Sequence, residues 1–259
     1  KTLEGREIMA LCAEIKNLSV SFAGTEALKN ISLELPQEGI TVLLGRSGSG
    51  KTTLLRSLNR LNETFAGCRT EGSVKLLFDG RLTDLYGAGA PELTNLRRKV
   101  GMVFQTPNPL PLSLRKNITL PLRLVLKLGK KECEERMEKA LRDVGLWDEV
   151  KDRLNSQAAA FSGGQQQRLC MARTLALEPD LLLLDEPTAS VDRRSSELIE
   201  NHILSLKNRL PIIVVSHNLA QAARLGDRFV FLREGAAGET LPADKLPRGE
   251  AAAELEKLL

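Results

Sequence analysis

The stretch that determines the fold of this chain reads Gly45-Arg46-Ser47-Gly48-Ser49-Gly50-Lys51-Thr52. It matches the phosphate-binding pattern G-x-x-x-x-G-K-[ST], which is meaningful between a strand and a helix. The wholly apolar run 40–44 before it predicts a buried parallel strand. The leucine spacing of 52–61 after it predicts a helix. The sequence therefore predicts a strand–loop–helix unit whose loop binds phosphate.

This loop combines three ways of holding a phosphate chain. Its glycines let backbone N–H groups surround a β-phosphate, and the following helix N-terminus adds positive potential. Lys51 brings a full positive charge to the β- and γ-phosphates, and the hydroxyl of Thr52 is a candidate Mg²⁺ ligand. The loop therefore predicts a ligand with β- and γ-phosphates, bound together with Mg²⁺.

A second predicted strand ends in two acidic residues. The run 181–184 consists of four leucines and is followed by Asp185 and Glu186. Carboxylates at the C-terminal end of a buried parallel strand face the same crevice as a phosphate loop. We expect Asp185 to hold Mg²⁺ through water and Glu186 to polarise the attacking water.

Between these two motifs lies the turn Ser162-Gly163-Gly164-Gln165, which opens a helix predicted over 165–177. A hydroxyl, two flexible glycines and a helix N-terminus make a second candidate anion site. Taken alone, the same residues are equally typical of an ordinary helix cap. The turn by itself therefore leaves both interpretations open.

Strands and helices alternate at both ends of the chain. The predicted strands are 14–22, 28–35, 40–44, 74–78, 100–104, 181–184, 212–215 and 228–232, and the predicted helices are 52–61, 130–144, 165–177, 194–208 and 219–225. This alternation indicates a parallel α/β sheet, and the texture between about 107 and 177 indicates a helical insertion.

Composition excludes several classes of protein. The chain has 259 residues, of which 27% are charged and 42% apolar, with a net charge of +4. The most apolar stretch, 118–128, is interrupted by Pro121, Arg123 and Lys127, and no run approaches the roughly 20 residues of a membrane-spanning helix. A mild charge and nine aromatic residues disfavour nucleic acid as a partner. Four isolated cysteines provide no disulfide framework or zinc pattern, which favours a reducing compartment.

Together these motifs resemble the ATP-binding cassette family, the nucleotide-hydrolysing subunits of ABC transporters. The phosphate loop, the Ser162 turn and the Asp185-Glu186 pair occur in the order and spacing of that family. Gln105 matches the glutamine that links the nucleotide site to membrane subunits, and the segment 189–192, ending in Asp192, resembles the D-loop. His217 matches the switch histidine that contacts the γ-phosphate. The resemblance extends to about residue 240.

The resemblance implies a P-loop ABC-type ATPase with a parallel α/β core, an antiparallel β subdomain and an inserted helical subdomain. A single domain is expected over 10–246, with a helical subdomain at about 106–178 and a short C-terminal helix at 247–259. Expected catalytic residues are Glu186, His217 and Lys51, and expected Mg²⁺ ligands are Thr52, Gln105 and Asp185. The ATP-binding residues that it implies are Phe22, Gly45, Arg46, Ser47, Gly48, Ser49, Gly50, Lys51, Thr52, Thr53, Gln105, Ser162, Gly163, Gly164, Gln165 and Asp192.

The resemblance also implies partners. A head-to-tail homodimer is expected, because the chain has one phosphate loop and one signature turn, so that a monomer encloses each ATP only halfway. Two integral membrane permease subunits at the cytoplasmic face of the plasma (inner) membrane, and indirectly a solute-binding protein, complete the expected assembly. The Pro-rich segment 106–115 is the expected docking surface, although its prolines also fit a merely stiff loop.

Within the family, the likeness sharpens toward the ATP-binding subunits of bacterial phosphate importers, in the segments 100–109, 146–154, 165–173 and 216–224. The chain departs from the usual residues at Phe22 (usually tyrosine), Arg46 (proline), Ser49 (cysteine) and Phe161 (leucine). Phe22 should still stack on adenine, because stacking needs only a ring face. Since none of these residues would touch the transported solute, phosphate import is the expected function, and another oxyanion or an amino acid stays an alternative.

A cassette ATPase acting on DNA or ribosomes is a further alternative. Only about 110 residues separate the phosphate loop from the signature turn, without the sustained heptads of a long coiled coil, and a single cassette is present. Both features favour a transporter subunit. Two smaller expectations concern Lys1 and His202: residues 1–8 are interpreted as an expression remnant or an overlong start, and His202 as an ordinary surface residue of a charged helix.

Overall fold

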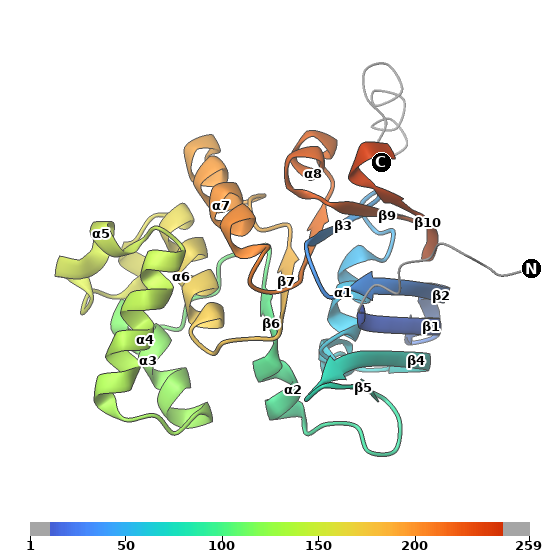
Figure 1. Cartoon of the computed structure of the whole chain (residues 1–259), viewed down its shortest axis with the longest axis horizontal. Coiled ribbons are helices and arrows are strands. Elements are labelled where there is room, and N and C mark those ends of the chain that lie inside the picture. The colour runs from blue at the N-terminus through green and yellow to red at the C-terminus, as the bar shows by residue number, and fades with distance from the viewer. Residues whose placement is uncertain (1–10, 246–259) are drawn as a thin grey trace, which may run out of the picture.

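The computed structural model describes residues 11–245, which form two β-sheets flanked by helices (Figure 1). Within this range the larger sheet has the strand order β10-β9-β3-β8-β7-β6. Its strands are β3 (Ile40–Leu44), β6 (Val100–Val103), β7 (Leu181–Asp185), β8 (Ile212–Ser216), β9 (Arg228–Arg233) and β10 (Ala236–Pro242). The neighbours from β9 to β6 pair in parallel, and β10 pairs antiparallel with β9.

The central strands of this sheet divide the hydrophobic core in two. Every residue of β3, β7 and β8 is buried, as expected for parallel strands covered on both faces. Because successive side chains point to opposite faces, Leu182 and Leu184 pack in a cluster with the helices on one side. Leu181 and Leu183 pack in a second cluster with the smaller sheet. The parallel sheet therefore lies between the helices on one side and the smaller sheet on the other.

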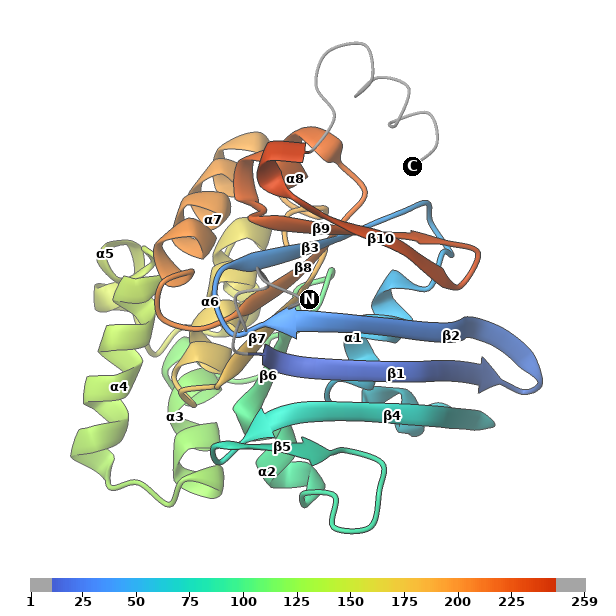
Figure 2. The same cartoon turned by 45° about the vertical axis from the view of Figure 1, so that its right-hand side comes forward.

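The smaller sheet is antiparallel, with the order β2-β1-β4-β5. Its strands are β1 (Leu11–Phe22), β2 (Thr25–Pro36), β4 (Cys68–Phe78) and β5 (Arg81–Asp84). Ala23 and Gly24 join β1 to β2, and both have positive φ, as a two-residue hairpin with type I′ geometry requires. The helix α1 (Lys51–Ser57) lies beside the antiparallel strands (Figure 2). Its leucines are buried in the cluster shared by the two sheets.

Helices from the middle of the chain gather at the end of the molecule away from the antiparallel sheet (Figure 1). They are α3 (Leu114–Val125), α4 (Lys130–Asp143), α5 (Trp147–Val150) and α6 (Gly163–Leu175). The remaining helices are α2 (Leu93–Lys99), α7 (Arg193–Leu206) and α8 (Leu219–Leu225), with short 3-10 turns η1 (Leu61–Thr64), η2 (Lys151–Arg153), η3 (Ala158–Ala160) and η4 (Ala243–Lys245). None of the helices within residues 11–245 has the length and apolarity to cross a membrane.

The structure corrects several predicted boundaries. The helix expected over 52–61 ends at Ser57, because Asn62 donates to the Thr53 carbonyl and the Ser57 hydroxyl and thereby ends the helical turn. The strand expected over 100–104 ends at Val103. The sequence interpretation missed β5, β10, α2, α3 and α5.

Pro121 explains why α3 was missed, since a proline inside a helix removes one hydrogen bond. In the structure Pro121 lies within α3, where Leu114, Ile118 and Leu122 are completely buried at four-residue spacing. Burial of this stripe outweighs the lost hydrogen bond. The expectations for 1–8 and 247–259 concern residues outside the described range.

His202 is not the ordinary surface residue that was expected. Its imidazole is half-buried against Gly145, where an added Cβ would collide with the ring. Burial lowers the pKa of His202 below its usual value, and the nearby Arg168 acts in the same direction. The charged sequence around His202 concealed this contact because Gly145 lies far away along the chain.

Candidate nucleotide-binding site

The predicted phosphate loop connects β3 directly to α1. Gly45, Gly48 and Gly50 all have positive φ, of 155°, 79° and 99°. At Gly50 an added Cβ would lie 2.8 Å from the Ala27 carbonyl oxygen, and at Gly45 it would collide with the backbone of Leu232. These positions therefore require glycine for the path of the chain as well as for the approach of a ligand.

Lys51 places its charge inside this loop. Its Nζ donates to the carbonyl oxygens of Gly45 (2.6 Å) and Arg46 (2.8 Å). Burial lowers the pKa of Lys51, while the carboxylates of Glu186 and Asp185 act in the opposite direction. Beside it, the buried hydroxyl of Ser49 has no hydrogen-bond partner among the described residues. A buried hydroxyl of this kind is rarely left unpaired, and a phosphate oxygen would satisfy it.

Thr52 and Asp185 meet at the start of α1 and the end of β7. The Thr52 hydroxyl donates to Asp185 Oδ1 over 2.9 Å. Asp185 is 5% exposed, and burial raises its pKa above the usual value, although the Thr52 hydrogen bond and the nearby Arg56 oppose this. A hydroxyl and a carboxylate are the oxygen donors that Mg²⁺ prefers.

Thr52 and Asp185 together form a small set of oxygen donors. Within residues 11–245 no three His, Cys, Asp or Glu side chains form a group able to hold a metal ion. Mg²⁺ is usually bound by one or two carboxylates together with substrate phosphates and water, rather than by a complete protein cage. The residues present therefore fit Mg²⁺ bound together with a nucleotide.

Glu186 lies between Gln105 and His217. Its Oε2 accepts a hydrogen bond from Gln105 Nε2 (3.2 Å) and is 3.0 Å from His217 Nδ1. The three residues follow the carboxyl ends of β6, β7 and β8, which are neighbours in the sheet. Glu186 has a φ of +45°, in the left-handed region that non-glycine residues uncommonly adopt. The strand order thus brings together three residues that are far apart in the sequence.

The Ser162 turn forms the N-terminus of α6. Ser162 and Gln165 make a reciprocal capping box, in which each side chain accepts a hydrogen bond from the backbone N–H of the other. Gln165 Nε2 also donates to Glu149 Oε2 (2.8 Å), and Glu149 forms an ion pair with the buried guanidinium of Arg168. The side chains of Ser162 and Gln165 are therefore engaged by the start of their own helix and by Glu149, a residue that the sequence interpretation missed.

Asp192 caps a different helix. Its carboxylate accepts hydrogen bonds from the backbone N–H of Ser195 (3.0 Å) and from the Ser195 hydroxyl (2.7 Å) at the start of α7. These hydrogen bonds lower the pKa of Asp192. Thr53 lies in α1, while Arg46, Ser47 and Gly48 form the exposed tip of the phosphate loop.

Phe22, at the end of β1, belongs to a pair of aromatic rings. It packs edge-to-face against Phe65, with ring centroids 6.0 Å apart and an interplanar angle of 82°. The guanidinium of Arg56 lies 5.3 Å from the centroid of the Phe65 ring, which is 45% exposed. Phe65 was not among the predicted residues, because no sequence motif marks it.

Comparison with known proteins assigns the family. The ABC transporter family model matches residues 28–189. The phosphate import ATP-binding protein PstB of Borreliella afzelii (strain PKo) is 44% identical over 233 residues, which cover 90% of this chain and 88% of that protein. The protein of the same name from Idiomarina loihiensis is 45% identical over 233 residues, or 90% of this chain and 84% of that protein.

Two solved structures are similar across nearly their full length. CbiO1 from Clostridium perfringens, part of the ABC transporter complex cbiONQ, has a TM-score of 0.77 at 26% identity and covers 96% of this chain and 93% of its own. The ATP-binding cassette MJ0796, in a dimeric post-hydrolysis state bound to ADP and Pi, has a TM-score of 0.75 at 30% identity, with 92% and 99% coverage.

The chain belongs to the ABC transporter family, as one of its ATP-binding ATPase proteins. Within that family it is similar to the phosphate import ATP-binding proteins. The predicted fold class is confirmed by the two neighbouring structures and by the two-sheet architecture.

Proposed function

We propose that this protein is the ATPase subunit of an ABC importer for inorganic phosphate. The observation that carries the proposal is the position of Glu186, whose carboxylate is held between Gln105 and His217 close to a phosphate loop. The substrate is supported by the relatives named phosphate import ATP-binding protein, which are 44–45% identical over 90% of the chain.

In the proposed site, the triphosphate of ATP lies along the loop from Gly45 to Thr53. The Lys51 ammonium turns from the loop carbonyls to the β- and γ-phosphates, and a phosphate oxygen pairs with the buried Ser49 hydroxyl. The adenine stacks on Phe22, with Phe65 holding that ring edge-on. Thr52, Asp185 and the amide oxygen of Gln105 would hold Mg²⁺, which neutralises charge on the phosphate oxygens when it is bound.

The proposed reaction is hydrolysis of the γ-phosphate. Glu186 orients a water molecule and accepts one of its protons, while the water oxygen forms a bond to the γ-phosphorus. The bond from the γ-phosphorus to the bridging oxygen breaks, and the products are ADP and inorganic phosphate. His217 and Gln105 hold the Glu186 carboxylate in place. A positioned general base of this kind contributes about 10²–10⁴ in rate.

We propose a head-to-tail homodimer for the assembled enzyme. The signature residues Ser162, Gly163, Gly164 and Gln165 belong to the helical end of the molecule, and their hydrogen bonds run to α6 and to Glu149. In the dimer this turn would close over the nucleotide of the partner, together with the segment that ends at Asp192. The dimeric state of the similar cassette bound to ADP and Pi supports this arrangement.

The proposed membrane partners are two integral permease subunits at the cytoplasmic face of the plasma membrane, served indirectly by a solute-binding protein. Segment 106–115, which follows Gln105, is the proposed docking surface. It leads into α3, on which Leu120, Leu124 and Val125 are exposed by 36%, 60% and 37%. Apolar side chains exposed side by side are typical of protein interfaces. We further propose that 10–246 is one domain and that 106–178 is its helical subdomain.

Uptake measurements test this function directly. Cells that lack the protein should lose high-affinity phosphate uptake and retain the uptake of other solutes. The wild-type gene should restore phosphate uptake, and Glu186→Gln should not. Normal phosphate uptake together with a defect in another solute would contradict the substrate. Full rescue by Glu186→Gln would contradict the mechanism.

A further inference from the structure

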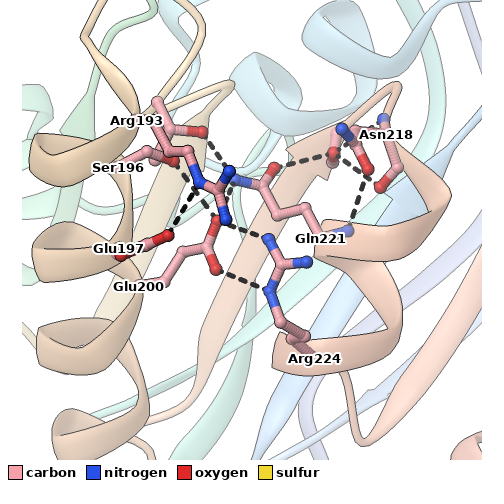
Figure 3. Close-up of polar contacts among 9 residues, drawn as sticks. Arg193, Ser196, Glu197, Glu200, Asn218, Gln221 and Arg224 are labelled. Atoms are coloured by element: carbon pink, nitrogen blue, oxygen red, sulfur yellow. Dashed lines mark hydrogen bonds and ion pairs between the residues drawn. The ribbon is translucent and has the colours of Figure 1, made fainter.

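The buried amide of Gln221 joins three segments of the chain (Figure 3). Gln221, on α8, is 6% exposed. Its Nε2 donates to the Thr188 hydroxyl (2.5 Å) and to Glu200 Oε1 (3.0 Å), and its Oε1 accepts from the Ser216 hydroxyl (2.9 Å). Both the nitrogen and the oxygen of the amide are therefore engaged, each with partners of the matching kind.

Glu200 fixes the orientation of this amide. It lies on α7, is 5% exposed, and receives two hydrogen bonds from the Arg224 guanidinium, at 2.9 Å and 3.0 Å (Figure 3). Burial pushes the pKa of Glu200 upward, but the hydrogen bonds from Arg224 and Gln221 outweigh it and hold this pKa below its usual value. An ionised carboxylate only accepts hydrogen bonds. Gln221 must therefore present its N–H group to Glu200 and its oxygen to Ser216.

The segments that Gln221 joins carry the proposed catalytic residues. Ser216 precedes His217, and Thr188 lies two residues after Glu186. Glu186, Thr188, His217 and Gln221 line one cavity of about 180 Å³. The hydrogen bonds of Gln221 therefore border the cavity shared by Glu186 and His217, on the side where α8 lies.

The turn around His217 is fastened to Gln221 at a second point. The backbone N–H of Gln221 donates to Asn218 Oδ1 (2.9 Å), and the backbone N–H of Asn218 donates to the Ser216 hydroxyl (3.0 Å). His217 itself is 61% exposed, so few packing contacts are available to hold its ring. Its position depends instead on the two residues that flank it, and both are bonded to Gln221.

We propose that Gln221 is a positioning residue for ATP hydrolysis, held in its working orientation by the Glu200–Arg224 pair. Its amide keeps the His217 turn and the loop after Glu186 at a fixed separation, so that His217 Nδ1 stays 3.0 Å from Glu186 Oε2. Gln221 acts through these residues and has no contact with the phosphate loop in this role. The inference rests on the proposed function, since it assumes that Glu186 and His217 act on ATP.

Gln221→Met tests the role, because it retains the length of the side chain and removes its donors and acceptor. We expect the kcat for MgATP hydrolysis to fall by about tenfold to a hundredfold, the effect typical of losing a partner that orients a site residue. The Kd for MgATP should stay unchanged, because Lys51 and Thr52 are not altered. Melting temperatures measured alongside show whether each variant is folded.

A matched pair on α7 controls for changes in surface charge. Glu200→Gln replaces the acceptor of Arg224 and Gln221, so it should lower kcat in the same way as Gln221→Met. Glu197→Gln makes the same chemical change one turn away, at an exposed residue whose carboxylate forms an ion pair with Arg193 (Figure 3). It should leave kcat at the wild-type value.

Imidazole NMR provides a readout that a general loss of packing would not reproduce. The chain contains two histidines, His202 and His217, so the ring signals of the untagged protein are readily assigned. In Gln221→Met we expect the His217 signals to shift and the His202 signals to stay in place. A movement confined to His217 would locate the change at the turn that Gln221 holds.

Several results would overturn the positioning role. It is overturned if Gln221→Met has an unchanged kcat or unmoved His217 signals. It is also overturned if Gln221→Met loses as much MgATP affinity as kcat, or if both Gln221→Met and Glu200→Gln unfold. Glu186→Gln separates this inference from the proposed function. If that variant still hydrolyses ATP at the wild-type rate, the proposed catalytic role of Glu186 fails, and with it the basis of this inference. If it is inactive while Gln221→Met is normal, only the role of Gln221 fails.

Discussion

Two glycine-containing turns open helices in this protein, and they treat the backbone N–H groups of those helices differently. Before α1, Gly50 provides no side-chain cap, and the Ser49 hydroxyl is buried without a partner among the described residues. Before α6, Ser162 and Gln165 cap the helix reciprocally, and the turn is exposed. The first turn leaves a buried hydroxyl that a ligand can pair with, whereas the side chains of Ser162 and Gln165 in the second turn already pair with each other's backbone N–H groups. We therefore expect a bound ligand to add a hydrogen bond at Ser49 without disturbing the cap of α6.

Glu186→Gln should have the largest effect, and it tests whether the two turns come together. The amide retains the shape of the side chain but cannot accept the proton of water, so kcat should fall by about 10²–10⁴. Binding of MgATP should persist, because the phosphate loop is untouched. Size-exclusion chromatography with MgATP should show a dimer, and with ADP a monomer. An inactive variant that stays monomeric with MgATP would argue against a shared site.

Lys51→Ala should have the next largest effect, on the phosphate loop alone. Hydrogen bonds to charged groups are worth about 1.5–3 kcal/mol, which corresponds to an increase of about tenfold to a hundredfold in the Kd for MgATP. Isothermal titration calorimetry measures this Kd. Lys131→Ala, at a side chain that is 93% exposed on α4, is the control and should bind normally. If Lys51→Ala binds MgATP with unchanged affinity, the loop does not bind the phosphates of ATP.

Phe22→Ala should weaken nucleotide binding without changing its selectivity. Stacking on one base is worth roughly 1–3 kcal/mol in nucleic-acid complexes, and a ring face does not distinguish adenine from guanine. The Kd values for ATP and GTP should therefore rise together. Phe65→Ala sharpens the test: it removes the edge-on support of Phe22 and should have a smaller effect in the same direction. If both Kd values stay the same in Phe22→Ala, the base binds elsewhere.

Ser162→Phe should have the smallest effect on the single subunit. Loss of its N-cap should lower the free energy of unfolding by about 1 kcal/mol, measured by urea denaturation. MgATP binding should be retained, while the Glu186→Gln, Ser162→Phe double variant should no longer dimerise. Glu92→Ala removes the cap of α2 and controls for lost helix capping. A double variant that still dimerises would show that the Ser162 turn does not lie at the interface.

The buried parallel strands β3, β7 and β8 and the phosphate loop were predictable because their signals are local. A run such as Ile40–Leu44 is apolar throughout because it is covered on both faces, and this shows in the sequence itself. The loop after it depends on glycines at fixed spacing, which the order of residues also reveals. Asp185 and Glu186 were expected at a strand end for the same reason, and the structure has them there.

Contacts between distant residues were not predictable in this way. Glu149, Phe65 and Gln221 carry no motif of their own, and each contacts a candidate site residue or its neighbour from another element. The burial of His202 against Gly145 was missed on the same grounds. The lengths of α1 and α3 also depended on specific tertiary packing and on side-chain hydrogen bonds, as at Asn62 and Pro121.

The sequence by itself determined which chemical groups the protein carries and the strand or turn on which each one lies, because backbone propensity and hydrophobic period act over a few residues. Only the tertiary structure decided that Gln105, Glu186 and His217 meet. They meet because β6, β7 and β8 are neighbours in the sheet. The same strands in another order would show the same local sequence patterns without bringing the three residues together. Strand order depends on the packing of helices on one face of the sheet and of the smaller sheet with α1 on the other, which is a property of the whole chain.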